Sequence, residues 1–276
     1  FRQYEKVYSL VPDPTDSLAD RFDAIIVGAY EQTGQQVAIL IDEYDSPLQH
    51  SWKTPQHEAC TAIYREVFAI LKADDKYEKF VFITGITKFT QFSLFSVLNN
   101  LSNISFEPNY AAICGITKEE VLRDFKPEIN KLAAKNDWNL DEALAQLAAY
   151  YDGYHFCHEN MVDVFNPFSL INALADSKLK NYWASSGATS TLPKFVDNME
   201  IRLKDFENCP VDCDTLETSD VTGGGAELFL YQSGYLTIKG YMDDIYLLGI
   251  PNYEVRKALY RIVLPALTLK KNDQVI

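Results

Sequence analysis

The stretch VAILIDEYDSPL, residues 37–48, runs five apolar residues directly into Asp42, Glu43, Tyr44 and Asp45. An apolar run of this length without polar alternation predicts a strand that is buried in a parallel sheet covered by helices. Three carboxylates at the tip of such a strand repel one another unless a positive charge or water separates them. The pattern therefore indicates either a site for a metal ion with a phosphate or a solvated loop.

The sequence around this stretch predicts an α/β unit. Residues 79–85, KFVFITG, form a second apolar run, and residues 54–72 between the two runs have helical spacing. Strand, helix and strand in this order predict a right-handed unit with parallel strands. We also expect a helix over residues 16–34, ended by Gly34, and a third strand at YAAIC, residues 110–114.

Near residue 115 the predicted pattern changes from alternating strands and helices to mostly helices, and we place a domain boundary there. Helices are expected after it, interrupted by a β-hairpin over residues 235–250 that turns at Asp243 and Asp244. The expected helices cover residues 116–135, 139–156, 166–176, 182–199 and 251–267, and a loop with a short helix is expected over 87–101.

Composition narrows the classes of function. The chain has 276 residues and a formal net charge of −14, which opposes direct binding of a nucleic-acid backbone. Its five cysteines are scattered in apolar segments, so we expect free thiols and a reducing, cytoplasmic location. No apolar run is long enough to span a bilayer, and no membrane partner is expected.

The Asp-Glu pair after an apolar strand is the pattern of a Walker B strand. The carboxyl ends of parallel strands line the ligand crevice of an α/β sheet, where a carboxylate can hold Mg²⁺ through water. This gives Asp42 the metal role, and Glu43 the role of a base that activates the attacking water. Thr84, at the end of the second strand, would sense a phosphate or polarise that water. The alternative for these residues is an ordinary strand exit into a polar loop.

The motifs extend along nearly the whole chain and together resemble the AAA-ATPase-like family of bacterial proteins. They are VAILIDEYDSPL, FVFITGITKFTQFSLFSVLNNLSNIS, YAAICGITKEEV, YYDGYHF, VFNPFSLINAL, YWASSGATSTLPKFV and LFLYQSGYLTIKGY. The resemblance implies a P-loop NTPase-like core, of which residues 1–115 are the Walker B half. It implies a mostly helical lid-like domain over residues 116–276, with a C-terminal β-hairpin and helix.

The resemblance also implies ATP and Mg²⁺ as cofactors, with Asp42, Glu43 and Thr84 at the family's positions. Lys88 follows the second strand and would reach a phosphate, or else is a solvated loop lysine. Asp45 is expected to stabilise the loop. The 276 residues contain no G-x-x-x-x-G-K-[ST]. We therefore expect a fragment whose P-loop lies upstream of Phe1 and whose nuclease-like domain follows Ile276.

Two functions follow as hypotheses. The first is an ATPase module that drives a linked effector such as the nuclease-like domain, with a homo-oligomer as one assembly and with residues 1–276 alone inactive. The second is a nucleotide-independent scaffold with a degenerate ATPase fold. Zinc binding by His155, Cys157, His158, Cys209 and Cys213 is set aside, because their spacing fits no zinc motif.

Overall fold

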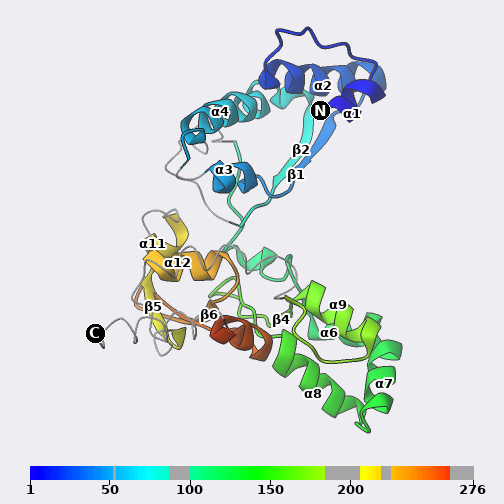
Figure 1. The fold of residues 1–276 in the computed structure, drawn as a ribbon, viewed down its shortest axis with the longest axis vertical. Helices are drawn as coiled ribbons and strands as arrows, with labels where there is room; N and C mark the ends of the chain where they lie inside the picture. The colour runs from blue at the N-terminus through cyan, green and yellow to red at the C-terminus, as the bar shows by residue number, and fades with distance from the viewer. Residues whose placement is uncertain (52–53, 87–99, 184–205, 219–224, 262–276) are drawn as a thin grey trace, which may run out of the picture. The chain divides into compact units, whose positions relative to one another are not determined.

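The computed structural model describes residues 1–51, 54–86, 100–183, 206–218 and 225–261. The chain is a mixture of helices and small sheets and forms two compact units (Figure 1). The first unit lies within Phe1–Ser102, and the second within Asn103–Thr218 and Thr222–Ile276. The boundary between the two units thus follows Ser102, whereas the change in predicted secondary structure suggested a boundary near residue 115.

The first unit contains the expected parallel pair of strands. Strand β1 (Val37–Ile41) pairs with β2 (Glu78–Ile83) in parallel register, from Ala38 opposite Phe80 to Ile41 opposite Ile83. The other elements of this unit are α1 (Arg2–Val7), α2 (Leu18–Thr33), α3 (Ser46–Ser51), α4 (His57–Ala73) and the short 3₁₀ helix η1 (Asp75–Tyr77).

Helix ends in the first unit follow local chemistry. The Ser17 side chain caps α2 in a capping box with Asp20, and Gly34 ends that helix with a φ of 67°. Helix α4 begins at His57, not at the Thr54-Pro55 pair that the sequence suggested. The short helix α3 occupies residues for which the sequence indicated only a loop.

Helices α2 and α4 pack on one face of the β1–β2 pair. The buried cluster there contains Ile26 of α2, Ile39 of β1, and Phe68 and Leu71 of α4. On the opposite face Leu40 is 72% exposed and Phe80 54% exposed. The expectation of a strand covered on both sides is wrong for the described residues, because both helices lie on the side of Ile39 and successive side chains alternate between faces.

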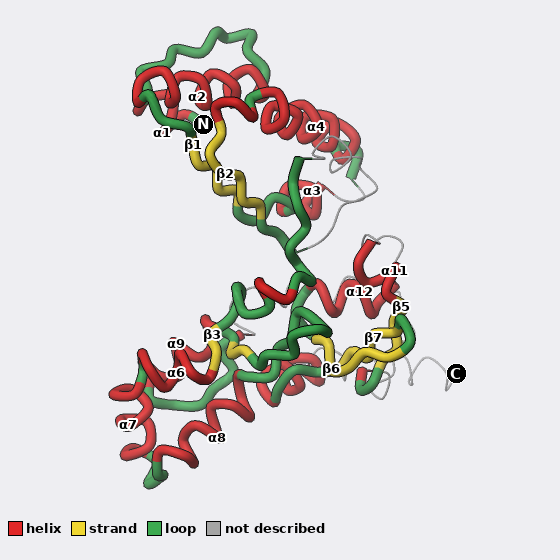
Figure 2. Tube along the Cα trace, turned by 180° about the vertical axis from the view of Figure 1, so that it is seen from behind, coloured by secondary structure: helices red, strands yellow, loops and turns green. Residues whose placement is uncertain are grey.

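The second unit has a helical part and a small antiparallel sheet (Figure 2). The helices are α6 (Lys118–Asp124), α7 (Lys126–Lys135), α8 (Leu140–Tyr151) and α9 (Pro167–Asp176), and the strands β3 (Ile116–Thr117) and β4 (Val164–Phe165) pair beside them. Their core buries Ile129, Leu132, Leu147 and Leu170 completely. The expected helix over 116–135 is two helices, because Pro127 stands at the start of α7 and cannot continue a helix.

The predicted hairpin is confirmed. Strand β6 (Thr237–Met242) pairs with β7 (Ile245–Gly249), and Asp243 and Asp244 both adopt positive φ, as a tight primed turn requires. Strand β5 (Cys209–Asp212) adds to the other edge of β7, so the strand order is β5-β7-β6. Two short helices, α11 (Cys213–Thr218) and α12 (Gly225–Gln232), belong to the same part of the chain.

The remaining expectations have mixed outcomes. The strand at residues 110–114 is wrong: the 3₁₀ helix η3 (Pro108–Tyr110) leads into turns, in which Ile113 N–H donates to the Tyr110 carbonyl. The last helix is present over residues 253–261. The elements expected over 87–101 and 182–199 lie almost wholly outside the described residues.

Candidate active site at the carboxyl ends of β1 and β2

The parallel pairing brings Asp42 and Thr84 together. Each residue directly follows its strand, and both strands end at the same edge of the sheet. The Thr84 hydroxyl donates a hydrogen bond of 2.5 Å to Asp42 Oδ1, although the two residues are 42 positions apart. The Glu43 backbone N–H donates to the same oxygen at 2.9 Å. Asp42 Oδ1 is therefore held by two donors.

The second carboxylate oxygen of Asp42 is differently placed. Within the described residues no hydrogen bond reaches Oδ2, and the side chain is exposed. An exposed carboxylate with one oxygen fixed and the other open is suited to a hard cation, directly or through water. The donor type thus fits the Mg²⁺ that the sequence predicts for Asp42.

Glu43 has an unusual backbone for a non-glycine residue. Its φ is 51°, in the left-handed region, which costs free energy and is enriched at functional sites. Its side chain is exposed, and it makes no hydrogen bond or ion pair within the described residues. A carboxylate in this state is an accessible proton acceptor, as a base for a water molecule must be.

The chain leaving β1 crosses to the chain leaving β2. Thr84 N–H donates to the Ile41 carbonyl at 2.8 Å, and Tyr44 N–H donates to the Thr84 carbonyl at 2.9 Å. Tyr44 is 7% exposed and packs edge-on against Phe68 of α4. The site is therefore attached to the core of the first unit.

Asp45 has the loop contact expected of it. It is 1% exposed, and its carboxylate accepts hydrogen bonds from the Gln49 side chain at 2.6 Å and from Ile86 N–H at 3.2 Å. The pKa of Tyr64 is raised to about 12, mainly by burial and to a smaller extent by the charges of Cys60 and Asp45. The structure thus places a buried acid behind the exposed pair Asp42 and Glu43.

Sequence reasoning missed two parts of this arrangement. It did not assign a role to Tyr44 or Gly85, although they pack directly on each other: a Cβ on Gly85 would lie 2.5 Å from the Tyr44 ring and 2.6 Å from Asp45 Oδ1. A glycine two residues after an apolar strand was the available signal. Lys88 lies outside the described residues, so its role stays a prediction, as do the catalytic roles of Asp42, Glu43 and Thr84.

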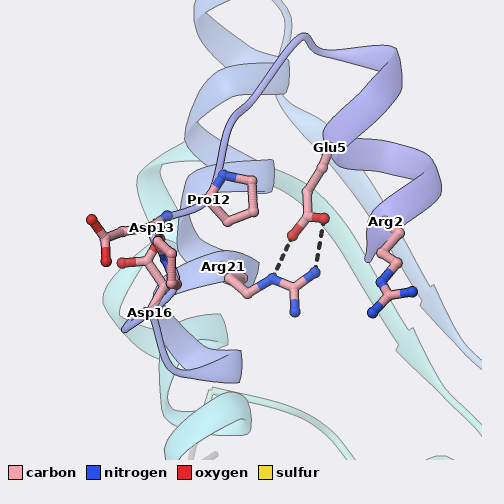
Figure 3. A pocket seen from close by; sticks show the side chains of 7 residues that line it. Arg2, Glu5, Pro12, Asp13, Asp16 and Arg21 are labelled. Carbon is pink, nitrogen blue, oxygen red and sulfur yellow. Dashed lines mark hydrogen bonds and ion pairs between the residues drawn. The ribbon is translucent and has the colours of Figure 1, made fainter.

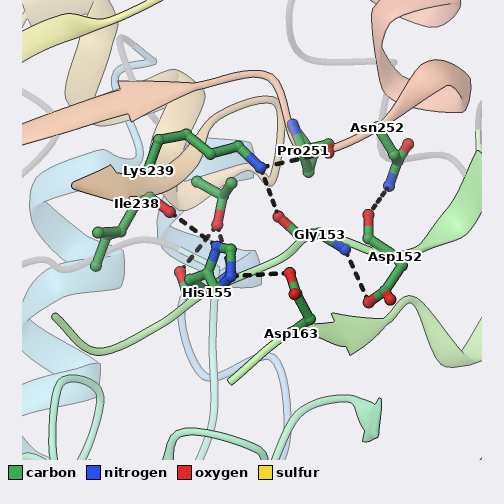
Figure 4. A network of polar contacts seen from close by, with 9 residues as sticks. Asp152, Gly153, His155, Asp163, Ile238, Lys239, Pro251 and Asn252 are labelled. Carbon is green, nitrogen blue, oxygen red and sulfur yellow. Dashed lines mark hydrogen bonds and ion pairs between the residues drawn. The ribbon is translucent and has the colours of Figure 1, made fainter. Parts of the chain in front are cut away.

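A polar network in the second unit surrounds the buried His155 (Figure 4). The His155 Nδ1 donates to the Ile238 carbonyl at 3.0 Å, and Nε2 lies 2.9 Å from Asp163 Oδ1. Lys239 Nζ donates to the carbonyl oxygens of Gly153 at 2.9 Å and of Pro251 at 3.4 Å. These contacts join residues 153–155 to Asp163, to residues 238–239 and to Pro251, which indicates a structural role.

Burial shifts the titration of this network. It lowers the pKa of His155 and of Lys239, and it raises the pKa of Asp152 to about 6. Gly153 has a φ of 90°, and a Cβ there would lie 2.5 Å from the Pro251 carbonyl oxygen, so glycine is required. Among the described residues no cluster of three or more His, Cys, Asp or Glu side chains could hold a metal ion.

A pocket of about 270 Å³ lies near the N-terminus (Figure 3). Two of its charged side chains form an ion pair: Arg21 donates hydrogen bonds to both carboxylate oxygens of Glu5, at 2.6 and 2.8 Å. Asp13 is bonded by Thr15 through both the backbone and the hydroxyl. We therefore assign this pocket no chemistry; its lining residues are Arg2, Glu5, Pro12, Asp13, Pro14, Asp16 and Arg21.

Comparison with known proteins finds similarity to one family over part of the chain. Residues 1–95, which include the strand-end site, match the model of the AAA-ATPase-like family, described as "Predicted AAA-ATPase". The resemblance to this family that the sequence motifs indicated is confirmed over residues 1–95. No solved structure matches the chain.

A curated relative extends the similarity beyond the family model. It is an "Uncharacterized protein in vnfD 5'region" from Azotobacter chroococcum mcd 1, 30% identical over 267 residues, which are 92% of this chain and 49% of the relative. The chain therefore spans about half the length of that relative. In the part of the chain that the structure describes, no helix is both long and apolar enough to cross a membrane.

Proposed function

We propose that this chain is part of an ATPase module whose active site includes the carboxyl ends of β1 and β2. The observation that carries the proposal is the convergence of Asp42 and Thr84, held by a hydrogen bond of 2.5 Å, beside the exposed and backbone-strained Glu43. The family match over residues 1–95 supports the same reading.

Each residue has a defined part in this proposal. Asp42 offers its open oxygen to Mg²⁺, directly or through water, while Thr84 and the Glu43 amide keep the carboxylate oriented. Glu43 accepts a proton from the attacking water. The hydrogen bond from the Thr84 hydroxyl links the end of β2 to Asp42. When bound, Mg²⁺ would neutralise charge on the phosphate oxygens of ATP. Lys88 would add a contact to phosphate.

The setting of the module is also a proposal. The five cysteines are free thiols, which supports a reducing, cytoplasmic location. By the resemblance, a P-loop segment precedes these residues and a nuclease-like domain follows them as the effector, with a homo-oligomer as one assembly. The regions from residue 1 to 115 and from 116 to 276 would then act as core and lid.

One observation favours a second candidate, a nucleotide-independent scaffold. The 276 residues carry no G-x-x-x-x-G-K-[ST], and the backbone N–H groups and lysine of that motif supply most phosphate contacts in P-loop proteins.

Calorimetric titration with Mg²⁺ and ATP separates the two candidates. The natural full-length protein that contains this chain is expected to bind ATP in a Mg²⁺-dependent manner, and residues 1–276 alone are expected to bind it poorly. No binding by the full-length protein would favour the scaffold. Tight binding by residues 1–276 alone would contradict the need for an upstream phosphate loop.

A further inference from the structure

The ends of the two strands are joined by a side chain as well as by backbone. Beyond Ile41 and Ile83 the strands continue to exchange hydrogen bonds, from Thr84 N–H to the Ile41 carbonyl and from Tyr44 N–H to the Thr84 carbonyl. The next link is made by Asp45, whose Oδ1 accepts from Ile86 N–H at 3.2 Å. Thr84 thus lies between a backbone contact on one side and the Asp45 contact on the other.

The other carboxylate oxygen of Asp45 connects this link to a helix. Oδ2 accepts from the Gln49 amide at 2.6 Å, one turn further along α3, and Gln49 N–H donates to the Asp45 carbonyl at 2.9 Å. Because Asp45 is 1% exposed, hydrogen bonds such as these compensate for the loss of water around its carboxylate. Loss of the carboxylate would therefore release residues 84–86 from α3.

Close packing shows that the link leaves little freedom. The Gly85 Cα lies so near Tyr44 and Asp45 that any Cβ would overlap both of them, at 2.5 and 2.6 Å. Thr84 is the residue directly before this contact, and its hydroxyl must reach Asp42 Oδ1 from across the sheet edge. A shift of residues 84–86 would change the distance between the Thr84 hydroxyl and Asp42 Oδ1. This hydrogen bond would then weaken, because hydrogen bonds weaken steeply with misalignment.

We propose that Asp45 is a positioning residue that clamps the exit of β2 to α3 and thereby sets the contact between Thr84 and Asp42. Its catalytic consequence rests on the function proposed above, whereas the clamp itself does not. Asp45 touches neither substrate nor metal in this account. It acts only through the geometry of Thr84.

The test uses paired substitutions in the full-length protein. Asp45→Ala removes the acceptor, and Gln49→Glu sets a second carboxylate against the first, so both are expected to open the clamp. Gln49→Glu combined with Asp45→Asn restores a donor and an acceptor, because the amide introduced at position 45 donates to the carboxylate introduced at position 49. Glu58→Gln, on the exposed side of α4, is the matched control.

Amide hydrogen exchange reads the clamp independently of activity. In Asp45→Ala and Gln49→Glu the amides of Tyr44 and Ile86 should exchange about tenfold faster or more, while those of α2 and α4 keep their protection. The double variant should return both amides to within about twofold of wild type. Unchanged exchange at Ile86 in Asp45→Ala, or no recovery in the double variant, would overturn the clamp.

The kinetic readout tests the consequence. If the wild type hydrolyses ATP, Asp45→Ala should lower kcat about tenfold with KM changed less than about twofold, and the double variant should recover kcat. An unchanged kcat beside faster exchange would overturn the positioning role. A wild type without hydrolysis would refute the proposed function instead, and the exchange data would then decide the clamp alone.

Discussion

The two ends of the β1–β2 pair both carry acidic residues, in opposite states. At the carboxyl end Asp42 and Asp45 receive hydrogen bonds from a hydroxyl, a side-chain amide and two backbone N–H groups. At the amino end Asp74 is 6% exposed, and Asp74 Oδ2 and Glu78 Oε1 are buried with no hydrogen-bond partner among the residues that the structure describes.

At the amino end, burial and neighbouring carboxyls disfavour ionisation. Burial, followed by the neighbouring carboxyl of Asp23, raises the pKa of Asp74 to about 6. Burial, followed by the charges of Asp74 and Asp75, raises the pKa of Glu78 to about 7. Hydrogen-bond donors thus surround the acids where the strands end, whereas burial and neighbouring carboxyls make the acids near the start of β2 harder to ionise. The same residue types form the proposed Mg²⁺ site at one end and a pH-sensitive contact at the other.

We expect the two ends of the β1–β2 pair to differ most in the effect of an Asp→Asn substitution on ATP hydrolysis. Asp42→Asn removes the charge proposed to hold Mg²⁺, so ATP hydrolysis by the full-length protein should fall at least about 100-fold. Asp74→Asn should leave the rate within about twofold of wild type. Steady-state kinetics at saturating Mg²⁺ measure both, and equal losses would mean that the two ends do not differ in function.

Gly85→Ala tests the tight packing at the carboxyl end. The added methyl would meet the Tyr44 ring at 2.5 Å, so we expect the free energy of unfolding to fall by about 1–3 kcal/mol. Gly240→Ala is the control, because its Cβ would meet only Leu247, at 3.6 Å. Urea unfolding followed by circular dichroism measures both variants, and an equal loss in the two would contradict the packing argument.

The amino end should make stability depend on pH. The folded-state pKa values of Asp74 and Glu78 lie above those of the unfolded chain, so their contribution is full below about pH 4 and is lost as the pH rises through about 6 and 7. Asp74→Asn should therefore stabilise the protein by about 1 kcal/mol at pH 8 and by less at pH 5.

Urea unfolding of Asp74→Asn at the two pH values checks this. Glu31→Gln, on the exposed part of α2, should show no such dependence on pH. A gain for Asp74→Asn that is the same at both pH values would place its origin outside the titration of these carboxyls.

Local patterns in the sequence were enough for much of the fold. The apolar runs around residues 37–41 and 79–83 predicted the parallel pair, and Asp243-Asp244 predicted the hairpin turn, because each signal lies within a few residues. Strand β5 was missed, since Cys209–Asp212 is too short to show alternation and depends on pairing with β7.

The candidate site was predictable in its residues but not in its contacts. The Asp-Glu pair and Thr84 stood at strand ends in the sequence, yet the bond between Asp42 and Thr84 spans 42 positions and the contact of Asp45 with Ile86 spans 41. The raised pKa values of Asp74 and Glu78 depend mainly on burial, and that of Asp74 also on Asp23, neither of which a short window of sequence shows.

The central claim, that the carboxyl ends of β1 and β2 form an ATPase site, is tested most directly through Glu43. Glu43→Gln keeps the shape of the side chain but removes the proton acceptor. In the full-length protein it should lower the rate of ATP hydrolysis by about 10²–10⁴-fold while Mg²⁺-dependent ATP binding remains. Hydrolysis within about twofold of the wild-type rate would contradict the claim.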